Sequence, residues 1–161
     1  MTSVTLHLLC GKIAAGKSTL ARNLVAEHSA ILLGEDQWLA RLYPGEINSV
    51  ADYVKYAKRV HEVLGPLVID LLRAGVPVVL DFPANTRAAR HWLRDLAEAA
   101  QVSHRLHYLD IDDATCRARL HARNARGEHE FAATDAEFDL ITRYFEAPVQ
   151  DEGLQIVRHG G

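Results

Sequence analysis

The chain has 161 residues, of which 48% are hydrophobic and 24% are charged, and its formal net charge is −3 at pH 7. This composition excludes a disordered chain, and the length suits one globular domain, so residues 1–161 are expected to form a single unit. The slight acidic excess lacks the basic footprint of proteins that bind nucleic acid, so we do not expect nucleic acid as a partner.

The sequence also shows no sign of export or of insertion into a membrane. Its first apolar run, 4–10, is too short for a signal peptide and follows no basic segment. No apolar run approaches the roughly 20 residues that span a bilayer. The two cysteines, Cys10 and Cys116, are expected to pack as small apolar side chains in a reducing compartment. We therefore expect a cytoplasmic protein with no membrane partner.

The first predicted strand, 4–10, leads into the segment GKIAAGKST at residues 11–19. This segment matches G-x-x-x-x-G-K-[ST], the P-loop that binds phosphate groups. Apolar residues at helical spacing follow over 20–26, so the motif stands between a strand and a helix, as it requires. Gly11 and Gly16 allow the backbone to turn tightly and approach an anion, and the N–H groups of the loop and the helix start then bind the phosphates.

The side chains of this loop have separate expected roles. Lys17 contacts the β- and γ-phosphates with its ammonium group, and Ser18 offers its hydroxyl to Mg²⁺. A nucleoside triphosphate and Mg²⁺ are therefore the expected ligands. The predicted nucleotide-binding residues of the loop are Gly11, Lys12, Ala14, Ala15, Gly16, Lys17, Ser18 and Thr19.

Two carboxylates follow the second predicted strand, 30–33. Asp36 is placed to face the γ-phosphate from the acceptor side and to act as a general base toward a hydroxyl group. Glu35 is its nearest competitor for that role. A different interpretation makes Asp36 the N-cap of a helix over 37–42, and the two roles are compatible.

The next predicted strand, 76–80, ends at Asp81 and resembles a Walker B element. In that interpretation the carboxylate of Asp81 holds Mg²⁺ directly or through water. The alternative is a carboxylate that caps a turn. Phe82 stands where many ATP-hydrolysing motors carry a glutamate that activates water, so the sequence argues against a dedicated ATPase.

A helix predicted to begin near residue 112 carries three arginines along one side, Arg119, Arg123 and Arg126. Like charges at this spacing destabilise a helix by about 0.2–0.5 kcal/mol per pair, so something should offset the repulsion. One hypothesis is a triphosphate, whose transferring group the guanidinium ions would stabilise. The other is pairing with surface carboxylates, for which the candidates are Glu128, Glu130 and Asp135.

Apolar strands alternate with helices along the chain, which predicts a parallel sheet covered on both faces. The predicted strands are 4–10, 30–33, 76–80, 104–111 and 154–159. A long helix over 50–71 contains Gly65-Pro66, which should kink or divide it. Residues 117–133 are expected to form a small helical lid, with a hinge in the segment that contains Gly127.

Four features follow one another in this chain: the P-loop, the segment GED at 34–36, the strand end LDFP at 80–83 and the pair Arg119-x-x-x-Arg123. In this order they resemble the small P-loop kinases of the AAA_33 type. That group is similar to zeta-toxin, chloramphenicol phosphotransferase, gluconate kinase and polynucleotide kinase domains. The resemblance covers nearly the whole chain.

The resemblance implies an α/β protein with the three-layer α/β/α fold of P-loop NTPases and a five-stranded parallel sheet of order 2-3-1-4-5. It implies ATP and Mg²⁺ as cofactors, with Asp36 as the base that activates a hydroxyl group. It suggests Arg119 and Arg123 as lid residues near the phosphates. It also suggests that Arg119 and the loop after Pro148 bracket the adenine.

These observations favour an ATP-dependent kinase that phosphorylates a hydroxyl group of a small molecule. Its predicted catalytic residues are Lys17, Asp36, Arg119 and Arg123, and its predicted metal ligands are Ser18 and Asp81. One alternative is a kinase of polynucleotide ends, against which the net charge argues. Another is an ATP-binding regulatory module, whose nucleotide-bound state a partner protein recognises and which needs no general base. The acceptor itself stays open.

Overall fold

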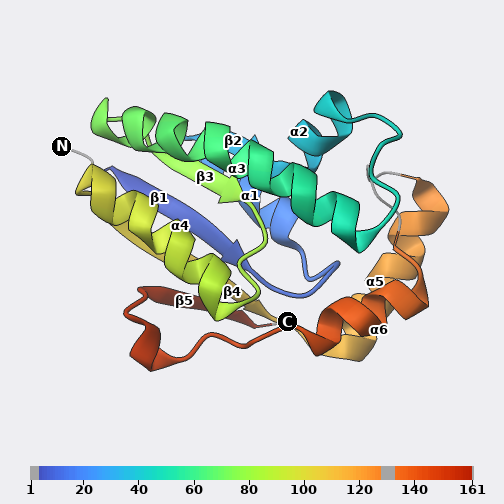
Figure 1. Ribbon diagram of the computed structural model, residues 1–161. Coiled ribbons are helices and arrows are strands. Elements are labelled where there is room, and N and C mark those ends of the chain that lie inside the picture. Colours follow the sequence, from blue (N-terminus) through green and yellow to red (C-terminus); the bar gives the residue numbers. More distant parts are fainter. Residues whose placement is uncertain (1–3, 128–132, 161) are drawn as a thin grey trace.

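The computed structural model describes residues 4–127 and 133–160. Its centre is a five-stranded sheet of order β2-β3-β1-β4-β5, in which all neighbouring strands are parallel. Helices cover both faces of the sheet (Figure 1), which confirms the predicted three-layer P-loop fold and its strand order. The strands are β1 (Thr5–Cys10), β2 (Ile31–Gly34), β3 (Val78–Asp81), β4 (Ser103–Asp110) and β5 (Ile156–Gly160).

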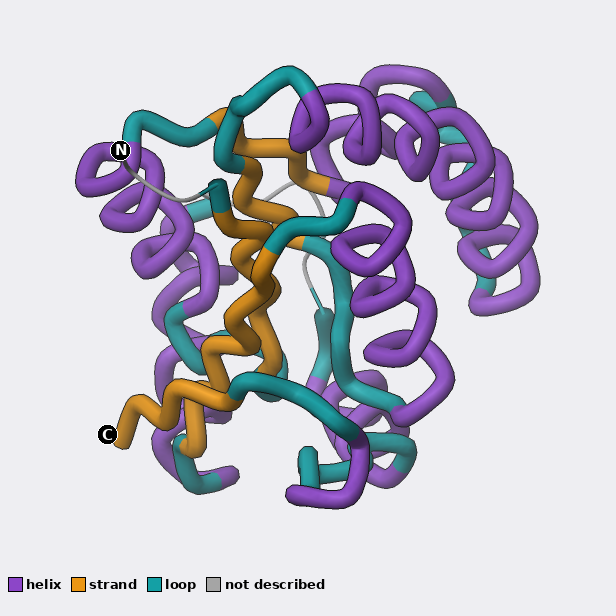
Figure 2. The backbone as a smooth tube through the Cα atoms, turned by 90° about the vertical axis from the view of Figure 1, so that its left-hand side faces the viewer, coloured by secondary structure: helices purple, strands orange, loops and turns teal. Residues whose placement is uncertain are grey.

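Helix α1 packs on one face of the sheet, and α3 and α4 pack on the other (Figures 1 and 2). Helices α5 and α6 lie beyond the carboxyl ends of the strands, at the same end of the molecule as the P-loop. The helices are α1 (Lys17–His28), α2 (Glu35–Leu42), α3 (Val50–Arg73), α4 (Arg87–Ala100), α5 (Asp113–Arg126), α6 (Asp135–Arg143) and the short 3-10 helix η1 (Gln150–Glu152).

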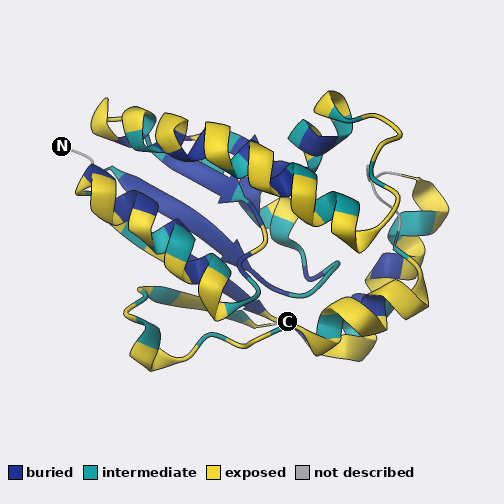
Figure 3. Cartoon of the chain, in the orientation of Figure 1, coloured by how far each residue is buried: buried dark blue, intermediate teal, exposed yellow. Residues whose placement is uncertain are grey.

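The core follows the alternation of side chains along β1. Leu6, Leu8 and Cys10 pack with residues of α3 and α4, whereas Leu9 packs against α1. All four side chains have no exposed surface. In Figure 3 the ribbon of β1 has the colour of buried residues. A central parallel strand covered on both faces needs apolar residues at successive positions, and Thr5 and His7 are the buried polar exceptions in β1.

The pair Gly65-Pro66 does not divide the long helix, because α3 runs without interruption from Val50 to Arg73. Pro66 is exposed, so the carbonyl oxygen of Glu62 that loses its helical N–H partner can bind water. Gly65 faces α4, where a Cβ would lie 3.4 Å from the ring of Trp92. The predicted division is therefore wrong, since each residue lies on a side of the helix that tolerates it.

The predicted lid, 117–133, begins inside α5, which ends at Arg126 with Gly127 as its C-cap at a φ of +64°. Residues 128–132 lie outside the described residues. They include Glu128 and Glu130, two of the three carboxylates considered as surface partners of the arginines. The extent of the lid and its hinge stay predictions.

Arg90 of α4 connects the segment between α6 and β5 to the rest of the protein through hydrogen bonds. Its side chain has no exposed surface. The guanidinium group donates to the carbonyl oxygens of Ala84, at 3.0 Å, and Glu146, at 2.7 Å, and to both carboxylate oxygens of Glu152, at 2.8 and 3.2 Å. A buried guanidinium needs such acceptors, because desolvation of an unpaired charge is costly.

Both cysteines are buried and neither forms a disulfide. Burial raises the pKa of Cys10 to about 11, so its thiol stays protonated at neutral pH. No helix within residues 4–127 and 133–160 is long and apolar enough to cross a membrane.

Candidate active site

The loop between β1 and α1 has the backbone shape of an anion-binding nest. Gly16, directly before α1, has a φ of +108°, and Ala14 has a φ of +63°. Such left-handed conformations turn successive N–H groups toward one side. Gly11 is closely packed, since a Cβ there would lie 3.2 Å from Cβ of Ala15 and 3.3 Å from Leu109. Gly16 is thus required by its backbone conformation, and Gly11 is required because a Cβ there would lie too close to its neighbours.

The loop after β3 forms a hydrogen bond with the P-loop. The N–H group of Gly11 donates a hydrogen bond to Oδ1 of Asn85, at 3.2 Å. The bond forms because β3 lies beside β1 in the sheet, which brings their carboxyl ends together. Sequence reasoning gave Asn85 no role toward the P-loop. Its signal in the sequence is limited to a polar side chain shortly after a strand.

Lys17 is the first residue of α1. Its ammonium group donates to the carbonyl oxygens of Gly11, at 2.6 Å, and Lys12, at 2.8 Å. Burial lowers the pKa of Lys17, while the carboxylates of Asp81 and, more weakly, Asp36 oppose that change. The ammonium group therefore lies over the loop and within the electrostatic reach of both carboxylates.

The oxygen donors that Mg²⁺ prefers are present at the same end of the sheet. Asp81 is the last residue of β3, and Ser18 and Thr19 are exposed in the first turn of α1. The charge of Asp81 also acts on Lys17, the residue expected to contact the β- and γ-phosphates. These residues fit a Mg²⁺ ion that takes its other ligands from phosphate oxygens and water. Within the described part of the chain, no group of three or more His, Cys, Asp or Glu side chains is arranged to hold a metal by itself.

Two adjacent carboxylates at the start of α2 have different surroundings. Glu35 has no exposed surface. Its Oε1 accepts a short hydrogen bond from the hydroxyl of Tyr53, and its Oε2 lies 2.5 Å from Nε2 of His61. Asp36 is half-buried instead. Its negative charge works to raise the pKa of three groups around it, those of Lys17, Tyr53 and Arg123.

The structure corrects the alternative role considered for Asp36. Helix α2 begins at Glu35, with Gly34 as its N-cap, so the predicted start at residue 37 is two residues late. An N-cap role for Asp36 is therefore wrong. Both carboxylates lie in the first turn, where negative charge interacts favourably with the helix dipole.

Two arginines of the predicted stripe on α5 face the nucleotide-binding end. Nη1 of Arg119 donates to the carbonyl oxygen of Ala15, at 3.2 Å. Arg123 is half-buried, and its Nε lacks a hydrogen-bond partner among the residues that the structure describes. Burial lowers the pKa of Arg123, and Asp36 opposes the change. A buried guanidinium N–H without an acceptor is costly, and a bound anion would satisfy it.

Among the described residues, two side chains of α5 outside that stripe form surface pairs with α6. Arg117 pairs with Asp135, at 3.2 Å, and with Asp139, at 2.5 Å. His121 lies 2.6 Å from Asp135 as well. Asp135, one of the carboxylates predicted to pair with the three arginines, thus contacts Arg117 and His121 instead. Arg126, the third member of the stripe, is exposed.

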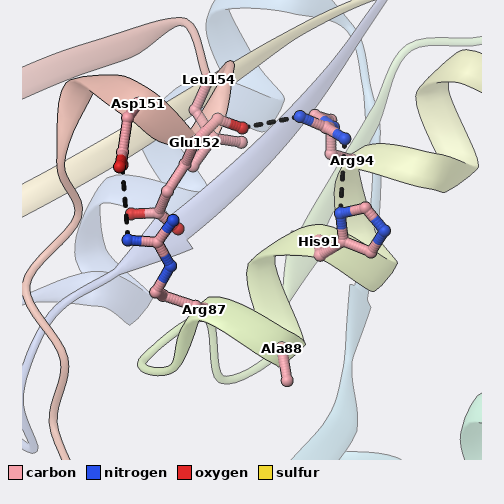
Figure 4. Close-up of a pocket in the computed structure, with 7 residues that line it drawn as sticks. All are labelled: Arg87, Ala88, His91, Arg94, Asp151, Glu152 and Leu154. Carbon is pink, nitrogen blue, oxygen red and sulfur yellow. Dashed lines mark hydrogen bonds and ion pairs between the residues drawn. The ribbon is translucent and has the colours of Figure 1, made fainter.

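Two cavities border the segment between α6 and β5. One, of about 490 Å³, lies between the start of α4 and η1; Figure 4 shows Arg87 paired with Asp151 and Arg94 bonded to the backbone of Glu152 there. The other, of about 400 Å³, is lined by Tyr108, Pro148, Val149, Gln150, Leu154, Ile156 and Arg158. Neither lining includes Arg119. The two residues expected to bracket the adenine, Arg119 and Pro148, therefore do not share either cavity.

Comparison with known families agrees with this geometry. Residues 6–148 match the family model AAA_33, which is described as an AAA domain. This chain belongs to the AAA_33 family. No curated protein matches its sequence at a significant level.

Solved structures that resemble this AAA_33 chain include nucleotide-bound proteins. A candidate kinase from Chloroflexus aurantiacus J-10-fl superposes with a TM-score of 0.75 at 18% identity, over 99% of this chain and 86% of the other. Mycobacterium tuberculosis APS kinase CysC, in complex with AMPPNP and APS, gives 0.64 at 19% identity, over 99% and 90%. Chaetomium thermophilum Kti12, in complex with ADP-AlF3, gives 0.68 at 17% identity, over 95% and 88%. At these identities the likeness shows the fold, which is that of P-loop kinases.

Proposed function

We propose that this AAA_33 protein is a kinase that transfers the γ-phosphoryl group of ATP to a hydroxyl group of a small molecule. One observation carries the proposal: half-buried Asp36 lies in the first turn of α2, directly after β2, and its charge acts on both Lys17 of the P-loop and Arg123 of α5. A carboxylate within electrostatic reach of a phosphate-binding lysine and an arginine is suited to accept the proton of an attacking hydroxyl. The AMPPNP and ADP-AlF3 in similar structures support a nucleotide donor.

Asp36 is the general base in this proposal. Its carboxylate accepts the proton of the acceptor hydroxyl while the hydroxyl oxygen bonds to the γ-phosphorus. The bond between that phosphorus and the bridging oxygen breaks, and ADP leaves with the electron pair. Glu35 is excluded from this role, because it has no exposed surface and both of its oxygens are engaged by Tyr53 and His61.

Positive charge supplies the remaining catalysis. Lys17 exchanges the carbonyl oxygens that it now contacts for oxygens of the β- and γ-phosphates. Arg123 brings an N–H group that has no acceptor among the described residues, and Arg119 already touches the P-loop. Mg²⁺, held by Ser18 and Asp81, would neutralise phosphate charge.

The adenine contact and the location of the protein belong to the same proposal. Arg119 and the loop after Pro148 bracket the base, which requires α5 and the segment at 148–150 to approach one another, since they share no cavity here. A cytoplasmic location fits the buried, unpaired cysteines, which a reducing compartment would maintain.

A screen for phosphate transfer tests the proposal. The protein is incubated with Mg²⁺, ATP labelled at its γ-phosphate and a panel of hydroxyl compounds, and mass spectrometry detects the gain of one phosphate. We expect one class of compound to be phosphorylated, and Asp36→Asn to slow transfer by about 100-fold or more, the usual contribution of a general base. Asp70→Asn, at an exposed position of α3, is the matched control and should retain activity.

Two results would contradict the kinase proposal. One is release of free phosphate alone, at a rate that Asp36→Asn leaves unchanged. The other is ATP-dependent binding of a partner protein, without transfer to any compound and without effect of Asp36→Ala. That second result would favour a regulatory module, whereas transfer to the ends of short oligonucleotides would favour a polynucleotide kinase.

A further inference from the structure

Helix α3 carries one apolar stripe whose two ends have different surroundings. The stripe follows a spacing of three and four residues through Val50, Val54, Ala57, His61, Leu64, Val68 and Leu72. Leu64, Val68 and Leu72 are buried against the sheet. The first turns of α3 extend past the carboxyl ends of the strands (Figure 1), and there Val50 and Val54 remain 65% and 59% exposed.

The exposed end of the stripe lies on the same turns of α3 as Tyr53, which contacts the neighbour of the proposed general base. Tyr53, which stands between the two valines in the sequence, donates its hydroxyl proton to Glu35, the neighbour of Asp36. The charge of Asp36 also contributes to the raised pKa of Tyr53. Val50 and Val54 are therefore uncovered apolar side chains at the end of the molecule where the acceptor hydroxyl must bind.

The charged side chains of these turns point to other sides of the helix. Lys55 and Arg59 lie over the ring of Tyr56, at 5.2 and 5.5 Å from its centroid. Tyr56 in turn stacks on Tyr43, at a centroid distance of 4.1 Å. Lys58 is exposed and borders the stripe on its outer side. No member of the stripe carries a fixed positive charge for a phosphate, sulfate or carboxylate on the acceptor.

We propose that Val50 and Val54 bind the body of the acceptor, and that the substrate class is a neutral alcohol with an aliphatic or aromatic group. Contact with such a group would release water from both apolar surfaces, whereas a polyol or a phosphorylated alcohol gains nothing from them. This inference rests on the proposed kinase function, because it assigns the substrate class of the same site.

Binding is tested first without any chemistry. Methyl-labelled valines are followed by NMR in the protein with Mg²⁺ and AMPPNP, while 2-phenylethanol, 1-hexanol, glycerol or glycerol 3-phosphate is added. We expect the signals of Val50 and Val54 to shift with the first two alcohols and to stay in place with the last two. Val63, which is 66% exposed on the outer side of the same helix, should not move. Equal shifts with glycerol, or none with either apolar alcohol, would overturn the inference.

Substitution then connects the stripe to turnover. With an alcohol that the wild-type protein phosphorylates, Val54→Asp should raise KM by about tenfold or more, the range expected for loss of an apolar contact. The matched variant Val63→Asp should keep KM and kcat. An unchanged KM in Val54→Asp would overturn the inference and leave the kinase function intact. The same holds if glycerol 3-phosphate is a substrate and its KM rises in Lys58→Ala. If no alcohol is phosphorylated, the kinase proposal fails, and the NMR shifts alone decide the inference.

Discussion

Nη1 of Arg119 donates a hydrogen bond to the carbonyl oxygen of Ala15, which joins α5 directly to the P-loop. One turn further along the helix, Arg123 is half-buried and its Nε has no acceptor among the described residues. The two arginines thus lie on the same helix but differ in their hydrogen bonding. One is already engaged by the loop, and the other has an N–H group that a phosphoryl oxygen would satisfy.

Removal of Arg123 should affect the rate of transfer more than nucleotide binding. We expect Arg123→Ala to lower kcat by about 100-fold, because the guanidinium group stabilises charge on the transferring phosphoryl group. The Kd of MgATP, measured by calorimetry, should change by less than about threefold. Arg117→Ala removes an exposed arginine of the same helix that pairs with Asp135 and Asp139, and it is the control. Equal losses in kcat and in MgATP affinity would make Arg123 a ground-state contact.

Glu35 should matter for stability in its own right. Glu35→Ala leaves Tyr53 and His61 without their shared acceptor, so the free energy of unfolding should fall by about 1–3 kcal/mol, as when a buried polar group loses its hydrogen-bond partner. Urea denaturation followed by circular dichroism measures the change. Glu62→Ala, at an exposed position of α3, should alter stability by less than about 0.5 kcal/mol. Similar midpoints for the two variants would show that the buried network contributes little.

Gly11 is required by space rather than by its backbone angle. In Gly11→Ala the new Cβ would lie 3.2–3.3 Å from atoms of Ala15 and Leu109, so the P-loop must shift. We expect at least a tenfold weaker MgATP affinity, about 1.4 kcal/mol, because the N–H groups of the nest lose their alignment. Gly160→Ala is the control, since a Cβ there meets nothing within 4 Å. Unchanged affinity in Gly11→Ala would mean that the loop can relax without cost.

A row of histidines should make the fold sensitive to acid. Nδ1 of His7 lies 3.1 Å from Nε2 of His107, and Nδ1 of His107 lies 3.1 Å from Nε2 of His159. Burial lowers the pKa of both His7 and His107 to about 4, with smaller contributions in the same direction from neighbouring histidines and from Arg105. In the unfolded chain the pKa of a histidine is about 6.5.

The unfolded state therefore binds more protons than the folded state between pH 6.5 and 4. Stability should be complete above pH 6.5 and should fall as the pH drops, by up to about 1.4 kcal/mol per pH unit for each of the two histidines. Urea denaturation at a series of pH values measures this slope for the wild-type protein and for His107→Gln, in which it should be smaller. His91→Gln, at an exposed position, should keep the wild-type slope. Equal slopes in all three proteins would contradict the assignment to the buried row.

The sequence predicted the features that depend on local pattern. The P-loop is continuous in the chain, and its glycines, lysine and serine keep their places at the junction of β1 and α1. The strands were recognised because apolar residues run through each of them between helical segments. Their order came from the family resemblance, and the register of β1 between β3 and β4 confirms it.

The features that the sequence did not reveal depend on contacts between distant residues. Glu35 meets Tyr53 and His61 because α2 and α3 pack together, and the sequence offered no reason to join those three side chains. The histidine row exists because parallel register places His7 and His107 in adjacent strands, which spacing along the chain does not show. The role of Asp36 as an N-cap failed because α2 starts two residues earlier than the apolar pattern suggests.

The central claim is that the P-loop holds the phosphates of MgATP under Lys17, at the end of the sheet where Asp36 and Arg123 converge. Calorimetric titration of the folded protein with ATP, with and without Mg²⁺, tests it most directly. We predict one site whose affinity depends on Mg²⁺ and falls by at least about 100-fold in Lys17→Ala, equivalent to about 2.7 kcal/mol. Binding that Lys17→Ala leaves unchanged, or no uptake of nucleotide by folded wild-type protein, would contradict it.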